Sequence, residues 1–417
     1  MKLFRFTAML ILGLTVFLTV VILSVPYDGE GVPSAPDEPQ PGSSEPSSGE
    51  QTELRAAWLS FFELTELFQD ADQQEFEARF EQIAAQAAAY GLNALIVQVR
   101  PYADAVYPST VYPWSHIITG TQGKDPGYDP LQSMVGLCHR YNLQIHAWIN
   151  PYRVKGKNNM ELSADNQALK WYNDMDNEYV VNVGGSLYFN PAAEPVKQLI
   201  LDGVAELVEQ YDIDGIHMDD YFYPSAEEGY DGDSYAAYLA AGGTEDLSSF
   251  RRENVNDLVQ RIYRLVKEKN PDVQFGISPG GNIEKNYNEQ FADVALWLSE
   301  DGYVDYVMPQ IYFGFEHGSL PFDDTADRWA QLLQAPGVKL YAGLPAYKIG
   351  ESDQYAGSGA EEWKHSTENL KKMVQHLRAN GNYSGFALYS FTSLFRPEEA
   401  VSAQVLLERE ALRSLLD

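Results

Sequence analysis

Two adjacent carboxylic acids, Asp219 and Asp220, follow the short apolar segment Gly215–Met218. Two acids held in one pocket push their pKa values apart, which leaves one ionised and the other protonated near neutral pH. Acid/base hydrolysis of an acetal needs such a pair. We therefore predict that Asp219 and Asp220 are catalytic, with Glu284 as a reserve carboxylate. The alternative interpretation is a helix cap or a surface pair in a very acidic chain.

Polar and aromatic side chains also follow, or alternate within, the other apolar segments of the chain. Alternation along the third segment places His146, Trp148 and Asn150 on one face. A buried polar residue within a strand needs a partner or a substrate, whereas aromatic residues there can also fill a core. We predict that these side chains bind the substrate: Gln98, Arg100, Tyr102, His146, Trp148, Asn150, Tyr152, Arg153, His217, Tyr221, Tyr223, Asn282, Gln310, Tyr312, Tyr347 and Tyr389.

The histidines and the cysteine do not indicate a metal site. The seven histidines have no close paired spacing, and Cys138 is the only cysteine, which excludes an intramolecular disulfide and a cysteine cluster. A lone thiol of this kind is usually a small buried hydrophobic group. We expect no metal and no organic cofactor.

The elements that must position these groups alternate regularly between strand and helix from residue 54 onward. The predicted strands are Arg55–Ser60, Ala94–Val99, Gln144–Ile149, Gly215–Met218, Gln274–Ile277, Tyr306–Met308, Lys339–Ala342 and Gly385–Ser390. The predicted helices are Gln73–Tyr90, Pro130–Arg140, Glu194–Gln210, Leu247–Lys269, Glu289–Leu298, Thr325–Leu333, Glu361–Ala379 and Pro397–Leu416.

Eightfold alternation predicts an α/β fold, a (β/α)₈ TIM barrel. The rival is an open α/β sheet, which would carry a glycine-rich turn after its first strand. That place holds Ser60 to Glu63, without glycine. The longest connections follow the third and fourth strands, on the side where barrel enzymes build their sites.

The first 53 residues differ from the rest in composition. Residues 6–25 carry no charge and follow Lys2 and Arg5, which is typical of an exported chain and is long enough to span a membrane. We predict a signal-anchor or signal peptide at 1–26, favouring the uncleaved anchor, a Pro/Ser/Glu-rich flexible linker at 27–53 and the barrel at 54–417. The protein is then extracytoplasmic, membrane-anchored or, if the segment is cleaved, secreted.

Composition excludes two further classes, an intrinsically disordered chain and a nucleic-acid-binding protein. Hydrophobic residues make up 45% of the 417 residues, which is ample for a large core. The formal net charge of -31 has the wrong sign for binding phosphates, so nucleic acid is not an expected partner. No obligate protein partner is evident.

Ordered blocks across the body resemble the glycosyl-hydrolase-like family 10 of bacterial exported proteins. They are RAAWLSF (55–61), GLNALIVQVRPYADAVYPS (91–109), DPLQSMVGLCHRYNLQIHAWINPYR (129–153), LYFNPAAEPV (187–196), YDIDGIHMDDYFYP (211–224), FGISPGGN (275–282) and DYVMPQIYF (305–313). The resemblance implies a TIM barrel that cleaves bacterial cell-wall glycan, particularly peptidoglycan strands stripped of their peptides. Such a substrate carries lactyl carboxylates, for which Arg100, Arg153, Lys155 and Lys348 are the expected local cations.

The resemblance leaves the mechanism open. In substrate-assisted cleavage, Asp220 is the general acid and Asp219 orients the 2-acetamido group. In direct double displacement, Asp219 is the nucleophile and Glu284 the proton donor. The alternative functions are a non-catalytic glycan-binding barrel and a hydrolase of another polysaccharide.

Overall fold

The computed structural model describes residues 53–157, 160–220, 222–224 and 226–416. The predicted membrane or signal segment at 1–26 and the predicted linker up to residue 52 lie outside these described residues. Within the described part, no helix is both long enough and apolar enough to cross a membrane.

Eight parallel strands form a closed barrel in the order β1-β11-β10-β9-β8-β7-β3-β2. This confirms the predicted (β/α)₈ architecture and rules out the open sheet. The strands are β1 (Leu54–Leu59), β2 (Ala94–Arg100), β3 (Gln144–Ile149), β7 (Gly215–Met218), β8 (Gln274–Ile277), β9 (Tyr306–Val307), β10 (Lys339–Leu344) and β11 (Tyr383–Leu388). Three of the eight predicted strands have the observed bounds, and the others differ by one or two residues at one or both ends.

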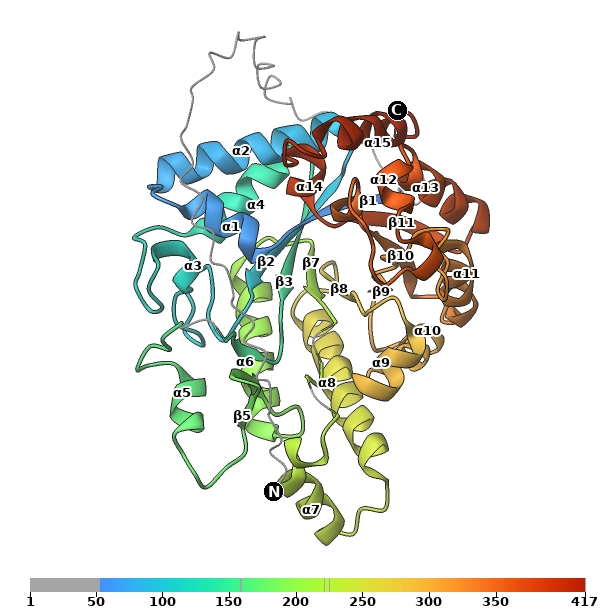
Figure 1. Cartoon of the computed structure of the whole chain (residues 1–417). Helices are drawn as coiled ribbons and strands as arrows, with labels where there is room; N and C mark the ends of the chain where they lie inside the picture. Colours follow the sequence, from blue (N-terminus) through green and yellow to red (C-terminus); the bar gives the residue numbers. More distant parts are fainter. Residues whose placement is uncertain (1–52, 158–159, 221, 225, 417) are drawn as a thin grey trace, which may run out of the picture. The chain divides into compact units, whose positions relative to one another are not determined.

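Helices surround the barrel on its outside (Figure 1). The main ones are α1 (Phe61–Phe68), α2 (Gln73–Tyr90), α4 (Pro130–Arg140), α6 (Glu194–Gln210), α8 (Leu247–Lys269), α9 (Ile283–Glu289), α10 (Val294–Ser299), α11 (Phe322–Leu332), α13 (Asn369–Asn380), α14 (Phe391–Phe395) and α15 (Ser402–Arg413). Local sequence fixes both ends of α2. The Asp72 carboxylate accepts from the Glu75 N–H at the start of α2, and Gly91 ends it in the left-handed conformation with φ 97°.

The predicted helix Glu289–Leu298 is wrong. The chain forms α9 up to Glu289 and starts α10 at Val294, because Phe291 adopts a left-handed φ of 55° between them. Asp293 then caps α10 by accepting from the Leu296 N–H at 3.1 Å.

The predicted helices Glu361–Ala379 and Pro397–Leu416 are also too long. The first divides into α12 (Glu362–His365) and α13, whose first N–H groups at Asn369 and Leu370 donate to the Glu408 carboxylate. The last helix, α15, begins only at Ser402. A cap supplied by a distant glutamate leaves no local signal, so propensity alone misses this break.

A polar column crosses the barrel interior. Trp58 Nε1 donates to His217 Nε2 at 3.2 Å, and the Tyr306 hydroxyl lies 2.9 Å from the Nδ1 atoms of both His217 and His146. Glycine makes room for it: a Cβ on Gly276 would come within 2.1 Å of the Tyr306 ring. The interior is therefore filled by hydrogen-bonded aromatic groups.

The long connections follow β3 and β7, as predicted. The first carries α5 (Gln167–Tyr172) and a small antiparallel sheet of order β4-β6-β5, formed by β4 (Arg153–Lys155), β5 (Val180–Val183) and β6 (Ser186–Phe189). The second carries η1 (Glu228–Tyr230) and α7 (Gly232–Ala240). Between β2 and α4 lies the short helix α3 (His116–Thr119).

The first and last described residues meet at the end of the barrel where the strands begin. Arg55 donates to the Leu416 carbonyl at 2.8 Å, and Arg378 forms an ion pair with Glu53 at 2.7 Å. The carboxyl ends of the strands, with their long connections, form the other end.

Candidate active site

A pocket of about 410 Å³ opens at the carboxyl ends of the barrel strands. Both predicted catalytic acids line it. Its described lining residues are Trp58, Ser60, Phe61, Phe62, Gln98, Trp148, Arg153, Asp219, Asp220, Ser278, Gln310, Tyr312, Tyr347 and Tyr389. Residues from the carboxyl ends of all eight strands, or from the connections directly after them, thus converge on one hollow, as a barrel requires of its site.

Asp219 is held from the side of strand β3. Its side chain is buried, and its Oδ2 accepts from Trp148 Nε1 at 3.0 Å and from Asn150 Nδ2 at 3.2 Å. Both donors carry hydrogens that are always present, so this oxygen acts as an acceptor toward both. Asp219 is therefore arranged as an acceptor with a fixed orientation.

Asp220 is directed to the other side of β7, toward β8 and β9. Burial raises the pKa of its carboxyl above the ordinary value, against the opposing effects of hydrogen bonds from Gln310 and Gln290 and of the Lys285 charge. Gln310 is itself fixed, because its Nε2 donates to the Ser278 carbonyl at 3.0 Å. Adjacent acids of one strand end thus occupy different environments, which is the arrangement that separates an acid from a carboxylate.

Aromatic rings form the walls of the pocket. Tyr312 and Tyr389 stack with centroids 5.8 Å apart, and Tyr347 meets both edge-on. After the neighbouring strand β1, Phe61 and Phe62 have centroids 4.0 Å apart, and Phe62 is 66% exposed. Such rings can cover the apolar faces of sugar units while their polar edges meet water.

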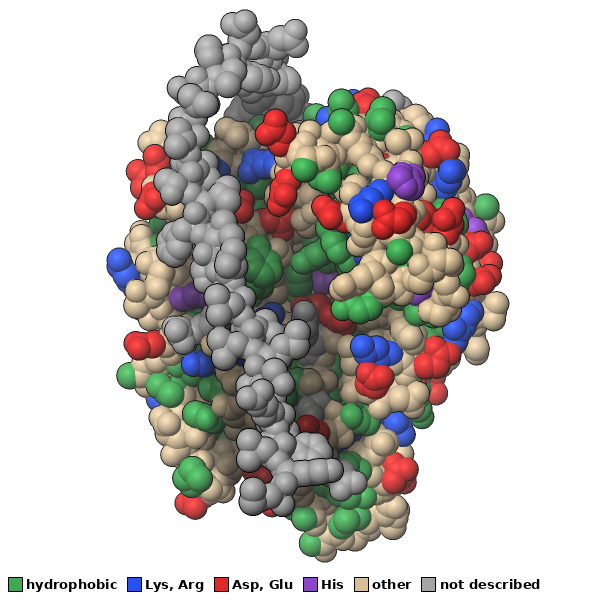
Figure 2. Space-filling view, viewed as in Figure 1, with side chains coloured by type: hydrophobic (Ala, Val, Ile, Leu, Met, Phe, Trp, Pro, Cys, Tyr) green, Lys and Arg blue, Asp and Glu red, His purple; other side chains and the backbone are tan. Residues whose placement is uncertain are grey.

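Arg153 is the one lysine or arginine among the described residues that line the pocket. Its guanidinium lies 4.8 Å from the centroid of the Tyr102 ring. The other predicted local cations lie elsewhere. Arg100 is buried over Tyr112, Lys155 donates to the Met160 carbonyl, and Lys348 forms an ion pair with Asp353. Acidic side chains are spread among basic and hydrophobic ones on the face seen in Figure 2.

His146 and His217 lie in the core beneath the pocket instead of lining it. Burial lowers the pKa of His146 to about 4 and that of His217 well below its ordinary value, so both are neutral. Their ring nitrogens are occupied by Tyr306 and Trp58. Contrary to the prediction that they contact the substrate, both histidines have a structural role.

Among the described residues, the other predicted binding residues do not line the pocket. Asn150 supports Asp219, and Asn282 caps α9 by accepting from the Lys285 N–H. Tyr102 packs between Arg153 and His116, whereas Tyr152 and Tyr223 are buried. Tyr221 lies outside the described residues. By contrast, Gln98, Trp148, Arg153, Gln310, Tyr312, Tyr347 and Tyr389 meet Asp219 and Asp220 in one pocket.

Glu284 does not line the pocket. It forms an exposed ion pair with Arg328, whose hydrogen bond lowers the pKa of Glu284. A proton donor needs the opposite shift. The reserve assignment of Glu284, and with it the double displacement that uses this residue as acid, does not fit the structure.

Sequence reasoning missed Trp58, Ser60, Phe61, Phe62 and Ser278 as pocket residues. The first four lie at the carboxyl end of β1 or directly after it, so their signal is the same as at the other strands: polar and aromatic residues at a strand end. Among the described residues, no group of three His, Cys, Asp or Glu side chains is placed to hold a metal ion.

Comparison with known proteins confirms the family resemblance. The family described as Glycosyl hydrolase-like 10 matches residues 53–358. Glycosyl hydrolase YngK of Bacillus subtilis (strain 168) is 37% identical over 313 residues, which cover 70% of this chain and 60% of YngK. Glycosyl hydrolase DigH of Escherichia coli (strain K12) is 31% identical over 344 residues, 76% of each chain. The match thus spans less than two thirds of YngK.

Two solved structures share the fold at low sequence identity. The PgaB (BpsB) glycoside hydrolase domain from Bordetella bronchiseptica superposes with a TM-score of 0.57 at 12% identity, covering 88% of this chain and 99% of that domain. The catalytic domain of beta-amylase from Paenibacillus polymyxa gives 0.57 at 10% identity, covering 89% of this chain and all of that domain.

Proposed function

The chain belongs to the glycosyl hydrolase-like 10 family, and we propose that it is a glycoside hydrolase that cleaves the glycan strands of the bacterial cell wall. The observation that carries this proposal is the pair Asp219 and Asp220. The two carboxyl groups line one pocket, and they differ in their hydrogen-bond partners.

In the proposed reaction, Asp220 is the general acid. It gives its proton to the glycosidic oxygen as the bond from that oxygen to the anomeric carbon breaks. The raised pKa of Asp220 keeps this proton available at higher pH than an ordinary aspartic acid would. Gln310, whose own position is fixed by Ser278, orients the carboxyl.

Asp219 orients the substrate. We infer that its carboxylate accepts the N–H of a 2-acetamido group and turns the acetamide oxygen toward the anomeric carbon, where that oxygen displaces the leaving group. Water then opens the cyclic intermediate and returns a proton to Asp220. The hydrogen bonds from Trp148 and Asn150 support this role, because they hold the carboxylate in place before substrate binds.

The proposed substrate is peptidoglycan glycan freed of its peptides, which alternates two N-acetylated sugars. The aromatic walls supply stacking surfaces, and Arg153 supplies a positive charge for a lactyl carboxylate. We further propose that residues 1–26 export the protein and anchor it, which puts the barrel in the compartment that holds this polymer.

The test incubates the body from residue 54 onward with purified glycan strands, with and without their peptides, and analyses the products by mass spectrometry. Asp219→Asn and Asp220→Asn are the matched variants. We expect new reducing ends from naked strands, lost in both variants. Strands that bind without being cut would instead identify a glycan-binding barrel, and strands neither bound nor cut would exclude this substrate.

A further inference from the structure

A second hollow adjoins the pocket on the far side of Phe61 and Phe62. It has a volume of about 1070 Å³ and lies between α1 and α3. Phe61 and Phe62 line both hollows, so the two adjoin at these rings. We call this second hollow the α1–α3 cleft; its other described lining residues are Thr65, Glu66, Phe68, Gln69, Asp70, Ala71, Asp72, His116, Ile117, Ile118, Thr119, Gly120 and Lys124.

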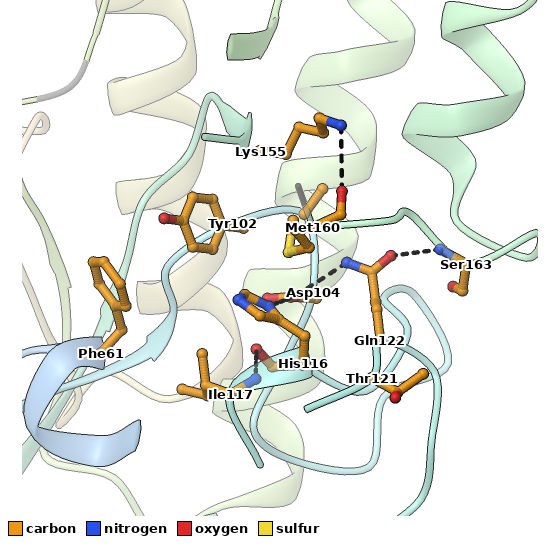
Figure 3. Close-up of polar contacts among 12 residues, drawn as sticks. Phe61, Tyr102, Asp104, His116, Ile117, Thr121, Gln122, Lys155, Met160 and Ser163 are labelled. Atoms are coloured by element: carbon orange, nitrogen blue, oxygen red, sulfur yellow. Dashed lines mark hydrogen bonds and ion pairs between the residues drawn. The ribbon is translucent and has the colours of Figure 1, made fainter. Parts of the chain in front are cut away.

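One polar side chain in the cleft is unusually well positioned. His116 Nδ1 lies 3.1 Å from Oδ2 of Asp104, a fully buried carboxylate. The contact has the geometry of a hydrogen bond that an Nδ1–H group donates to the carboxyl oxygen. Nε2 therefore lies on the side of the ring away from Asp104, and the side chain is 28% exposed at the cleft. Figure 3 shows Asp104 joined to His116 and Gln122, with Phe61 and Tyr102 beyond the ring.

A second side chain, that of Gln122, also holds Asp104 in place. Gln122 Nε2 donates to the same Oδ2 at 3.0 Å, and the orientation of that amide is fixed because its Oε1 accepts from the Ser163 N–H and from Asn166 Nδ2. The other oxygen of Asp104 is buried and has no hydrogen-bond partner in the described part of the chain. Burying a carboxylate with so few partners costs free energy, which an orienting role for His116 would explain.

The cleft and the pocket share one row of side chains. The His116 and Tyr102 rings have centroids 5.7 Å apart, and those of Tyr102 and Phe61 lie 5.5 Å apart. Arg153, which lines the pocket, covers both Tyr102 and Phe61. A polymer lying over Arg153 and Phe62 would therefore enter the cleft at His116.

We propose that the α1–α3 cleft is a substrate subsite that binds sugar units beyond those held in the pocket. Phe62 provides the stacking surface, and His116 Nε2 forms a hydrogen bond with a sugar hydroxyl or acetamide group. Asp104 and Gln122 are positioning residues that fix the tautomer and the angle of the imidazole. This inference rests on the proposed function and deepens it, because it makes the enzyme selective for long strands.

The test compares His116→Asn with the wild type on naked glycan strands separated by length. Asparagine can keep the bond to Asp104 through Nδ2 but has no counterpart of Nε2. We expect kcat/KM to fall about fivefold, the effect of losing one hydrogen bond, on long strands and to stay unchanged on the shortest strand cleaved. His365→Asn, the same substitution at an exposed histidine of α12, should change neither value.

A second measurement depends neither on catalysis nor on the folding of His116→Asn. In Asp220→Asn protein labelled with ¹⁵N, the His116 signals should show the Nδ1–H tautomer and should shift when long strands, but not short ones, are added. Such shifts in the variant, together with no cleavage of the same strands by the wild type, would support the subsite while rejecting the hydrolase.

Three results would overturn the subsite. If the wild type cleaves strands and His116→Asn has the same length dependence, the subsite is wrong and the hydrolase stands. An equal loss on short and long strands would place the effect of His116 in the pocket. Strands of every length neither bound nor cleaved would reject both proposals.

Discussion

Trp148 Nε1 donates to Asp219 Oδ2 across neighbouring strands, at 3.0 Å. The donor lies within β3 and the acceptor directly follows β7, so the register that pairs Trp148 with His217 also sets the position of the acid. Because Trp148 is only 6% exposed, its ring faces are packed in the core. Its contribution to the site is thus to hold Asp219, more than to stack on a sugar.

Trp148→Phe should keep most of the packing and remove the indole N–H. We expect kcat to fall about tenfold with little change in KM, because one hydrogen bond to a charged group contributes about 1.5 kcal/mol. The measurement is steady-state kinetics beside a melting curve. A change in KM alone would instead assign Trp148 to sugar stacking.

Asp220→Asn removes the proposed general acid while retaining the shape of the side chain. Turnover should fall by about 100-fold or more, and the affinity for glycan should remain. Turnover equal to that of the wild type would contradict the assignment of Asp220.

The pH profile tests the same residue independently. A general acid works in its protonated form, so the rate should decline as pH rises through the pKa of Asp220. Since burial raises that pKa, the decline should occur above the pH at which an ordinary aspartic acid ionises. Kinetics across pH provide the test, and the residual activity of Asp220→Asn should lack this step.

His146 should make the barrel sensitive to acid. Its folded pKa of about 4 lies below the ordinary 6.5, so the unfolded chain binds the proton first and stability falls as pH drops from about 6.5 to about 4. The loss reaches roughly 3 kcal/mol, since one pKa unit corresponds to about 1.4 kcal/mol. Urea unfolding at pH 7 and pH 4.5 measures it, and His146→Gln should show a smaller difference. If the wild type and His146→Gln lose the same free energy of unfolding between these pH values, His146 is not the source of the acid sensitivity.

Gly276→Ala should destabilise the barrel. The added methyl group would lie 2.1 Å from the Tyr306 ring, which is hydrogen-bonded to both histidines and has no room to turn. Overpacking of this kind costs about 1–3 kcal/mol, which thermal unfolding would detect. Gly136→Ala is the control, because that exposed position in α4 has open space for a methyl group. If Gly276→Ala is as stable as Gly136→Ala, the hydrogen-bonded groups in the barrel interior can shift to make room for the methyl group.

The alternation of segments was sufficient to predict the barrel, because each strand and most helices carry their own end signals. Gly91 after α2 is one such signal. Where a helix end depends on a distant residue, as α13 does on Glu408, the sequence alone could not reveal it. No local signal indicates the left-handed conformation of Phe291 either; its ring packs edge-on against Tyr223, a residue distant in the sequence.

For the candidate site, position at a strand end identified both acids and seven other pocket residues. It could not separate residues whose side chains reach the pocket from those that turn into the core. His217 precedes Asp219 by two positions, yet it hydrogen-bonds Trp58 and Tyr306 below the pocket. How far below the pocket a side chain lies depends on the closure of the barrel and on the space that Gly276 leaves. Neither can be read from the residues next to it in the sequence.

The meeting of the two described ends has a consequence for how the chain can be connected. Arg55 bonds to Leu416 and Arg378 pairs with Glu53, so residues 53 and 416 lie near each other at the end of the barrel away from the pocket. A short peptide could join them, and new termini could be opened in an exposed surface loop. A circularly permuted barrel of this kind would leave every strand pairing and every pocket residue in its present order around the ring.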